Sequence, residues 1–212
     1  MLSISDIRKE YKMRSLPEAD VAGDPFEQFS SWWEEAIASN VEEVNAMTLA
    51  TADAAGRPSA RIVLLKGMNE GGFEFFTNYE SHKAKEMEVN EHVALVFFWK
   101  ELERQVRIEG RVTKLTGQLS DAYFLSRPES SRIGAWASPQ SQPIASREAL
   151  EENVAAVQKQ FEGKEVSRPP FWGGYIVQPR MIEFWQGRPN RLHDRIAYAS
   201  ENGLWVKRRL AP

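Results

Sequence analysis

The chain of 212 residues contains no cysteine, which excludes disulfides, thiolate catalysis and zinc–cysteine sites. Its three histidines, His82, His92 and His193, lack the spacing that is typical of metal ligands. No stretch approaches the roughly 20 apolar residues that a membrane helix needs. The N-terminal residues also lack an apolar run of signal-peptide length. We therefore expect a cytoplasmic protein with no metal and no membrane partner.

A basic excess is also missing. Lys and Arg number 27 against 30 Asp and Glu, so the net charge is −3. Such a chain has no global positive field that would attract nucleic acid, and any anion must be recognised locally. The length and the 42% hydrophobic content support one sizeable core. We expect residues 1–23 to form a mobile arm and residues 24–212 a single domain.

A helix is predicted to begin after Asp24. Asp24 is a suitable N-cap, Pro25 occupies the first helical position and Glu27 the capping-box position. An apolar stripe at helical spacing is predicted to be buried; it consists of Phe26, Phe29, Trp33 and Ile37.

From Ala46 onward the hydrophobic period is close to two. The predicted strands are 47–53, 59–66, 72–78, 92–99, 103–115, 173–179, 181–187, 191–199 and 204–210. The predicted helices are 81–90, 117–126 and 146–162, and 127–145 reads as an ordered loop. Neither a βαβ pattern nor a G-x-G-x-x-G or Walker loop is present. These patterns predict a mainly β fold, an antiparallel barrel with helices packed outside.

Residues 190–198, NRLHDRIAY, place Arg191, His193 and Arg195 at alternate positions. On an extended strand these side chains share one face, roughly 6–7 Å apart. A row of cations repels itself, so the pattern predicts a bound anion; a chance surface row is the alternative. Asp194 would point away from the row, and a catalytic His–Asp pair is not expected.

Two clusters of hydroxyl and cationic side chains lie near predicted helix ends. They are Thr77, Ser81 and Lys83, and Tyr123, Arg127 and Ser131. Hydroxyls, cations and helix N-terminal amides suit a phosphate group. Each cluster alone also fits a helix end with polar decoration.

Arg61 and Lys66 bracket four aliphatic residues and fall on opposite faces of a regular strand. They serve one site only if the strand ends there, twists, or lies against a second subunit; a buried strand with solvated ends is the alternative. Gln105 adds an amide that suits the edge of a heterocycle, and Trp185 an aromatic face.

Several of these segments together resemble the pyridoxine/pyridoxamine 5′-phosphate oxidase family. They are RIVLLK (61–66), FFTN (75–78), SHKA (81–84), ERQV (103–106), SRP (126–128), SRIGAW (131–136), PQSQPI (139–144) and FWQG…RLHDR…RLAP (184–212). The resemblance runs from about Arg8 to the C-terminus. It implies an FMN-binding antiparallel split barrel and a homodimer with FMN at each subunit interface. It also implies oxidation of pyridoxine and pyridoxamine 5′-phosphate to pyridoxal 5′-phosphate, with O2 reduced to H2O2.

The resemblance also implies the site residues. FMN would be held by Arg61, Ile62, Val63, Leu64, Leu65, Lys66, Phe76, Thr77, His82, Lys83, Gln105, Gln140, Ser141, Trp185 and Arg195. The substrate would be held by Arg8, Lys9, Glu10, Tyr11, Lys66, Tyr123, Arg127, Ser131, Arg191, Leu192 and His193, with Arg191 and His193 as the catalytic pair. Two positions depart from the family pattern: His82 stands where arginine is usual, and Phe76 where tyrosine is common.

Two other functions fit the same residues. A related split-barrel flavin or deazaflavin reductase would keep the flavin residues but would not need the Tyr123, Arg127 and Ser131 cup. A non-catalytic carrier or sensor of FMN or pyridoxal phosphate would bind without turnover.

Overall fold

The computed structural model describes residues 3–4, 10–69 and 71–212. Contacts divide the chain into two compact units. Unit 1 contains 1–49, 94–110 and 179–212, and unit 2 contains 50–93 and 111–178. Strands β1, β5, β6 and β7 contribute residues to both units, so each unit is assembled from segments far apart in the sequence.

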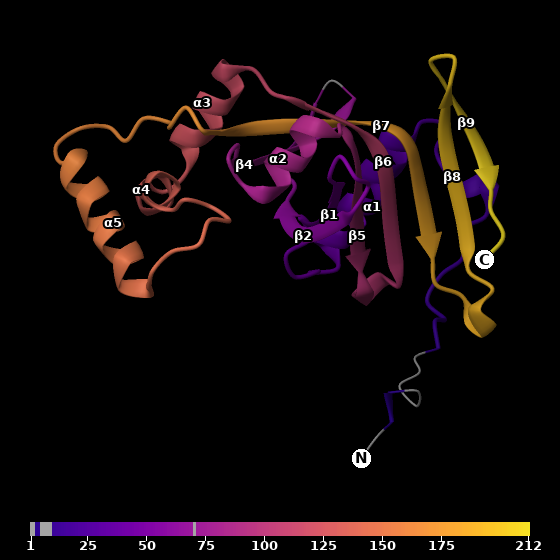
Figure 1. Ribbon diagram of the computed structural model, residues 1–212. Helices are drawn as coiled ribbons and strands as arrows, with labels where there is room; N and C mark the ends of the chain where they lie inside the picture. Colours follow the sequence, from indigo (N-terminus) through magenta and orange to yellow (C-terminus); the bar gives the residue numbers. More distant parts are fainter. Residues whose placement is uncertain (1–2, 5–9, 70) are drawn as a thin grey trace. The chain divides into compact units, whose positions relative to one another are not determined.

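Most helices and strands lie where the sequence pattern predicts them, and the exceptions are β3, β7, the start of β8 and α4 (Figure 1). The strands are β1 (Ala46–Ala52), β2 (Pro58–Leu64), β3 (Gly67–Asn69), β4 (Gly72–Asn78), β5 (His92–Trp99), β6 (Arg104–Lys114), β7 (Trp172–Gln186), β8 (Asp194–Glu201) and β9 (Leu204–Arg209). The helices are α1 (Pro25–Ala38), α2 (His82–Val89), α3 (Gly117–Ser126), α4 (Glu129–Ala137) and α5 (Arg147–Gln160), with short 3₁₀ turns η2 (Glu18–Asp20), η3 (Lys100–Leu102) and η4 (Pro189–Arg191).

The strands are hydrogen-bonded in the order β2-β1-β5-β6-β7-β4-β3, with β8 on β7 and β9 on β8. In unit 2, β4 pairs antiparallel with the first half of β7, so Phe75 faces Tyr175. In unit 1, the second half of β7 pairs antiparallel with β8, so Trp185 faces Arg195. The sequence predicts two strands here because Pro179 interrupts the pattern. In the structure β7 is one continuous strand, and Pro179 lies between its two paired halves.

Helix α1 begins as predicted, but it buries a different face. The Asp24 carboxylate accepts hydrogen bonds from the backbone N–H groups of Phe26 and Glu27, at 2.7 and 3.3 Å. The buried side chains of this helix include Phe29, Trp32 and Ala36, whereas Ile37 is 53% exposed. The predicted stripe is therefore wrong at its C-terminal end. Trp32 packs edge-on against Phe184, at 5.2 Å between ring centroids, and this contact sets the rotation of the helix.

Residues 127–145 are not wholly a loop, because α4 occupies Glu129–Ala137. The prediction missed this helix because Ser, Gly and Pro dominate the segment. Ile133 and Ala137 lie four residues apart, and both are buried. Ile133 joins a core cluster with Phe124, Val166 and Trp172, so tertiary packing selects the helix over weak local propensity.

The described part of the N-terminal segment packs within unit 1. Leu16 and Val21 are buried, and the Leu16 N–H donates to the Asp194 carboxylate at 3.0 Å. The Glu103 carboxylate accepts the N–H groups of Lys12 and Met13 at 2.8 and 3.1 Å. Mobility of residues 1–23 and a single domain over 24–212 stay predictions.

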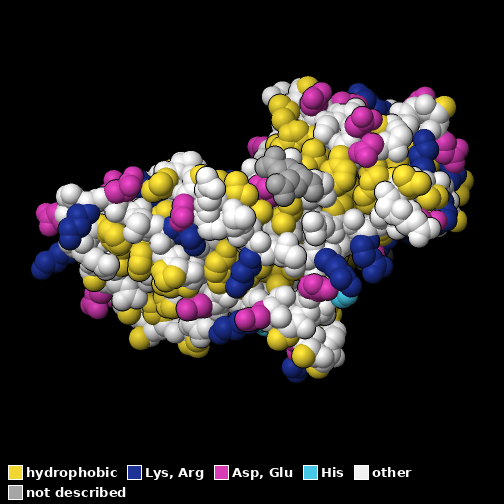
Figure 2. Space-filling view, turned by 90° about the horizontal axis from the view of Figure 1, so that it is seen from above, with side chains coloured by type: hydrophobic (Ala, Val, Ile, Leu, Met, Phe, Trp, Pro, Cys, Tyr) yellow, Lys and Arg dark blue, Asp and Glu magenta, His cyan; other side chains and the backbone are white. Residues whose placement is uncertain are grey.

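The exposed surface carries both charge signs. On the face shown in Figure 2, Lys and Arg side chains alternate with Asp and Glu and with hydrophobic groups. Among the residues that the structure describes, no helix is both long and apolar enough to span a membrane.

Candidate active site

A cavity of about 540 Å³ lies within unit 2. Its lining is rich in cations and aromatic rings and comes from five separate stretches of the chain. The lining residues are Arg61, Ile62, Val63, Leu64, Lys66, Phe76, Thr77, Lys83, Tyr123, Arg127, Pro128, Ser131, Gln140 and Trp172. Four of these are cationic and none is acidic. In a chain of net charge −3, such a wall is suited to an anionic ligand.

Arg61 and Lys66 line the same cavity although strand alternation places them on opposite faces. Strand β2 ends at Leu64, and β3 begins at Gly67. A strand end therefore lies between Arg61 and Lys66, whereas the twist and the second subunit stay predictions. Lys66 lies beyond the regular alternation, and its N–H donates to Glu74 O at 2.9 Å.

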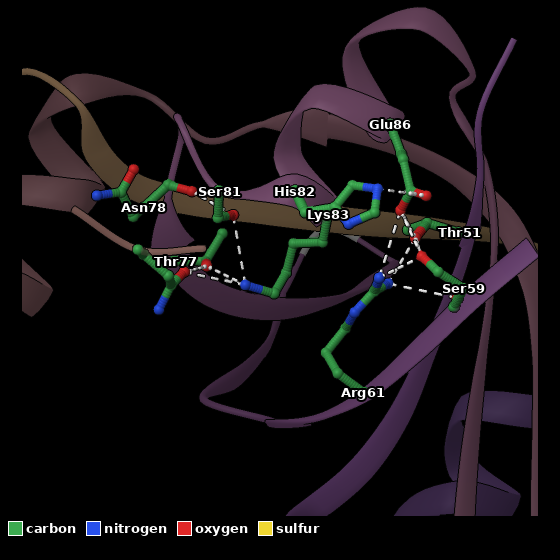
Figure 3. A network of polar contacts seen from close by, with 10 residues as sticks. Thr51, Ser59, Arg61, Thr77, Asn78, Ser81, His82, Lys83 and Glu86 are labelled. Atoms are coloured by element: carbon green, nitrogen blue, oxygen red, sulfur yellow. Dashed lines mark hydrogen bonds and ion pairs between the residues drawn. The ribbon is translucent and has the colours of Figure 1, made fainter. Parts of the chain in front are cut away.

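Lys83 is held by uncharged acceptors at one end of the cavity (Figure 3). Its Nζ lies 3.0 Å from Thr77 Oγ1, 3.3 Å from Ser81 Oγ and 3.0 Å from Gln140 Oε1. Burial, and next the charge of Arg61, lower the pKa of Lys83 to about 8. The predicted cluster of Thr77, Ser81 and Lys83 therefore exists, but the Ser81 hydroxyl donates to Asn78 O and does not cap α2.

Aromatic rings stack along another part of the wall. Phe76 lies 3.9 Å from Tyr123 between centroids, at an interplanar angle of 22°, and 5.7 Å from Trp172. A Cβ on Gly174 would lie 2.7 Å from Phe76 Cε1, so this position requires glycine for the ring to pack here. A flat wall of this kind suits a planar ring system.

Arg127 is the one cavity residue with an unsatisfied buried atom among the described side chains. Its Nη1 is buried with no hydrogen-bond partner. The guanidinium lies over the Trp172 ring, 4.7 Å from the centroid, and burial lowers the pKa of Arg127. A buried guanidinium N–H without an acceptor is costly, and an anion in the cavity would satisfy it.

Behind Arg61 lies a buried carboxylate that the sequence analysis did not single out. Glu86 of α2 accepts hydrogen bonds from Thr51 and Ser59, and it contacts Arg61 and His82. Burial opposes ionisation, but these hydrogen bonds and the two neighbouring positive groups outweigh it and lower the pKa of Glu86. The four-residue spacing of His82 and Glu86 was visible in the sequence, whereas the partners from β1 and β2 were not.

A second cluster lies in unit 1, at the turn before β8. The predicted strand face with Arg191, His193 and Arg195 is wrong, because β8 begins only at Asp194. Pro189 opens turn η4, and Asn190 and Arg191 have positive φ values of 56° and 62°. This left-handed backbone ends the extended alternation that the row requires.

His193 is packed between aromatic rings. Its ring lies 4.6 Å from Trp185 and 5.9 Å from Tyr11 between centroids. The Arg188 N–H donates to Nδ1 at 3.0 Å, so the proton of the neutral imidazole is on Nε2. Burial, and next the charge of Arg191, lower the pKa of His193, which keeps the ring neutral near pH 7.

Asp194 and Arg195 have structural partners. Asp194 accepts from Arg209 at 2.8 Å and lies 3.4 Å from Arg188 Nε, in agreement with its expected direction away from His193. Arg195 donates to the buried carboxylate of Glu183 at 2.7 Å and to Ala211 O at 2.9 Å. The bond to Glu183 raises the pKa of Arg195.

The structure brings most of the predicted unit 2 residues to one cavity. Leu65 is buried, while His82 and Ser141 are exposed and lie off the described wall. Glu10, Tyr11, Gln105, Trp185, Arg191, Leu192, His193 and Arg195 belong to unit 1. Arg8 and Lys9 lie outside the described residues. Trp172 and Pro128 were missed, because nothing in their local sequence distinguishes a wall residue from a core or turn residue.

Acidic and histidine side chains do not form a metal site in the described ranges. No group of three or more His, Asp or Glu gathers there in a way that would hold an ion.

Comparison with known proteins places these features in a family context. A family model described as pyridoxamine 5′-phosphate oxidase matches residues 33–161, and one described as pyridoxine 5′-phosphate oxidase C-terminal dimerisation region matches residues 172–212. Curated proteins named pyridoxine/pyridoxamine 5′-phosphate oxidase are similar over the full length. Those from Cyanothece sp. and Rubrobacter xylanophilus are 53% and 54% identical, covering 100% and 99% of this chain and 99% and 96% of theirs.

Solved structures show the same fold. The chain is similar to PhzG from Burkholderia lata 383, solved in complex with tetrahydrophenazine-1-carboxylic acid, with a TM-score of 0.87, 29% identity, and coverage of 93% and 97% of the two chains. A pyridoxamine 5′-phosphate oxidase-related FMN-binding protein from Nostoc punctiforme gives a TM-score of 0.71 at 17% identity, covering 91% of this chain and all of the other. The predicted fold class, a mainly β antiparallel split barrel, is confirmed.

Proposed function

Because the chain belongs to the pyridoxamine 5′-phosphate oxidase family, we propose that it binds FMN and oxidises pyridoxine and pyridoxamine 5′-phosphate to pyridoxal 5′-phosphate. One observation supports this most directly. Arg61, Lys66, Lys83 and Arg127 converge on a single cavity whose described wall has no carboxylate. Such a cavity suits phosphorylated ring compounds, because its cations can bind the phosphate.

The residues present fit FMN. The buried Nη1 of Arg127 lacks a partner, Lys83 is buried among hydroxyl and amide groups, and the Phe76 ring belongs to a flat aromatic wall. FMN, when bound, would supply the redox chemistry, which is acceptance of a hydride from the C4′ carbon of the substrate and reoxidation by O2 to give H2O2. Residues 61–66, Phe76, Thr77, Lys83 and Gln140 would hold it on the unit 2 side.

The substrate phosphate would be held by Lys66, Tyr123, Arg127 and Ser131. Arg127 contributes a fixed fork of donors, and Tyr123 and Ser131 contribute hydroxyls at the same cavity. A phosphate held at one point leaves the pyridine ring to be oriented from another, which is the role proposed for Arg191 and His193. Correct orientation of two reactants can lower a barrier by roughly 7–11 kcal/mol.

Arg191 and His193 would orient the substrate's pyridine ring and set the hydrogen bonds that it makes. The Nδ1 of His193 is occupied by the Arg188 N–H, so only Nε2–H remains as a donor. The guanidinium of Arg191 can offset negative charge on the oxygen attached to the substrate's ring. That these unit 1 residues meet the unit 2 cavity, within one subunit or across a homodimer, is part of the proposal, as are the FMN-side roles of Gln105, Trp185 and Arg195.

An aerobic assay tests the function. Purified protein with FMN and pyridoxamine 5′-phosphate is expected to produce aldehyde, ammonia and H2O2 in equal amounts, and pyridoxamine without its phosphate is expected to react far more slowly. Turnover of a different substrate by the flavin-loaded protein, with no reaction of pyridoxamine 5′-phosphate, would favour the reductase. Binding without turnover would favour the carrier.

Substitution of the pair tests the assigned roles. Arg191→Ala and His193→Ala are expected to lose at least about a hundredfold in kcat/KM, because orientation of the substrate is lost. FMN retention, measured from flavin absorbance after gel filtration, should equal that of the wild type. Release of FMN by either change would show that these side chains hold the cofactor instead.

A further inference from the structure

Glu86 is a buried carboxylate placed directly behind the cavity. It is 5% exposed and projects from α2, the helix that also carries the cavity residue Lys83. Its Oε2 accepts from Thr51 Oγ1 at 2.5 Å and from Ser59 Oγ at 2.6 Å. The remaining oxygen, Oε1, lies 3.2 Å from His82 Nε2. Together with Arg61, these residues give one carboxylate four partners. That is more than the capping or the solubility of a short helix requires.

Thr51, Ser59 and Glu86 also accept hydrogen bonds from Arg61 (Figure 3). The Nη1 of Arg61 donates to Thr51 Oγ1, and its Nη2 donates to Ser59 Oγ and, at 3.3 Å, to Glu86 Oε2. Arg61 also lines the cavity. One edge of its guanidinium is thus anchored to β1, β2 and α2, which restricts a side chain that otherwise has many rotamers.

Lys83, the neighbouring cation of the same wall, has different support. Its Nζ is hydrogen-bonded to the uncharged groups of Thr77, Ser81 and Gln140. A lysine presents a point charge and needs no fixed direction, whereas an arginine recognises a phosphate through donors in a rigid plane. A charged anchor is therefore useful for Arg61 in particular.

We propose that Glu86, with Thr51 and Ser59, is a positioning residue that holds Arg61 in the orientation in which it binds the phosphate of FMN. This inference rests on the proposed function and deepens it. Glu86 itself does not line the cavity, so it acts only through Arg61.

Orientation and simple electrostatics predict opposite results for Glu86→Gln. Removing a negative charge near the cavity would strengthen the binding of a phosphate if only the field mattered. The glutamine, however, can offer only a neutral amide oxygen to the donors of Thr51, Ser59 and Arg61, so these hydrogen bonds lose the charge that strengthens them and the anchor is weakened. The anchor is expected to dominate, because the charge of Glu86 is already paired with that of Arg61, and the field of such a pair falls off quickly.

Flavin titrations separate these outcomes. FMN and riboflavin, which lacks the phosphate, are titrated into flavin-free protein, and the flavin fluorescence is followed. Glu86→Gln is expected to weaken FMN binding about tenfold and to change riboflavin binding less than twofold. Glu88→Gln is the matched control, since it removes the same charge from an exposed position of the same helix and should change neither affinity more than twofold.

A double substitution shows whether Glu86 acts through Arg61. Arg61→Ala alone and Arg61→Ala with Glu86→Gln are expected to bind FMN equally weakly. If Glu86→Gln does not fold, as judged by circular dichroism, Ser59→Ala provides the test and should lose about threefold in FMN affinity only.

Three results would overturn the inference: FMN binding that is unchanged or tighter in Glu86→Gln, an equal loss for riboflavin, or full additivity with Arg61→Ala. Failure of the proposed function is distinct, because it shows in the wild type: either no preference for FMN over riboflavin, or no oxidation of pyridoxamine 5′-phosphate in the aerobic assay.

Discussion

At the scale of single residues, the environment decides what a side chain can do. Lys83 and Lys85 are two lysines of one short helix, and nothing in the local sequence distinguishes their chemistry. The structure partly buries Lys83 beside Arg61 and leaves Lys85 exposed. The pKa of Lys83, about 8, brings its charge into the range of ordinary buffers.

The pKa of Lys83 predicts a pH-dependent affinity for FMN. Below about pH 8 the amine is cationic and attracts the phosphate; above it, the amine is neutral. The dissociation constant of FMN is therefore expected to rise about tenfold between pH 7 and 9, and that of riboflavin to stay constant. Lys83→Met should abolish the rise, and Lys85→Met should keep it. A flat profile for the wild type would contradict the assignment.

The pKa of His193 offers a second residue-scale prediction. Burial and the charge of Arg191 both lower it, so Arg191→Ala should raise it while leaving it below the ordinary value, because burial remains. NMR titration of the imidazole Cε1–H signals measures this, with His193→Ala to assign the signal. The signals of His82 and His92 serve as internal references. An unmoved His193 titration would mean that Arg191 does not act on this ring.

At the scale of elements, the contacts between segments override local preference. Helix α4 forms in a segment rich in Ser and Pro because Ile133 reaches a core cluster. At Arg191 the cause is local instead, since Pro189 and Asn190 make a turn that ends the strand pattern. The described N-terminal segment is ordered, like α4, by contacts between segments. The Glu103 carboxylate binds two of its backbone N–H groups, and Tyr11 packs edge-on against Trp185.

Gly187 is expected to be necessary for this docking. A Cβ there would lie 2.7 Å from Tyr11 Cγ and 3.1 Å from Glu103 Cβ. Gly187→Ala should displace Tyr11 and speed tryptic cleavage after Lys12 and Arg14 at least severalfold, as followed by mass spectrometry. Gly134→Ala, where a Cβ meets nothing within 4 Å, should leave the cleavage rate unchanged. Equal rates for Gly187→Ala and the wild type would show that the segment docks without this contact.

At the scale of the whole molecule, β2 presents an exposed apolar face, which we expect to be buried against another protein surface. Its alternate residues are exposed, and among them Ile62 and Leu64 also belong to the cavity wall. Ile62 is 63% exposed, which is unusual for a large aliphatic side chain at a binding site. The match to a C-terminal dimerisation region supports a homodimer, and a second subunit would cover such a face.

If a second subunit covers this face, dimerisation and FMN binding are expected to depend on each other. The wild type should have a solution mass of about twice 24.2 kDa by light scattering and bind one FMN per chain. Ile62→Asp should shift the protein toward the monomer and weaken FMN binding, since a charge would be buried without a partner. Val89→Asp, at a similarly exposed position of 62% outside the cavity, is the control. A dimeric Ile62→Asp with normal FMN affinity would place the interface elsewhere.

The sequence alone was sufficient for features that depend on neighbours along the chain. The Asp24 cap, the period-two strands and the phosphate-suited clusters at Lys83 and Arg127 follow from local spacing, and the motifs identified the family. Tertiary structure alone decided which side chains share a wall. It brought Arg61, Lys83 and Arg127 to one cavity and placed Glu86 behind Arg61. Those outcomes depend on contacts between residues far apart in the sequence, and such contacts leave no periodic trace in either partner.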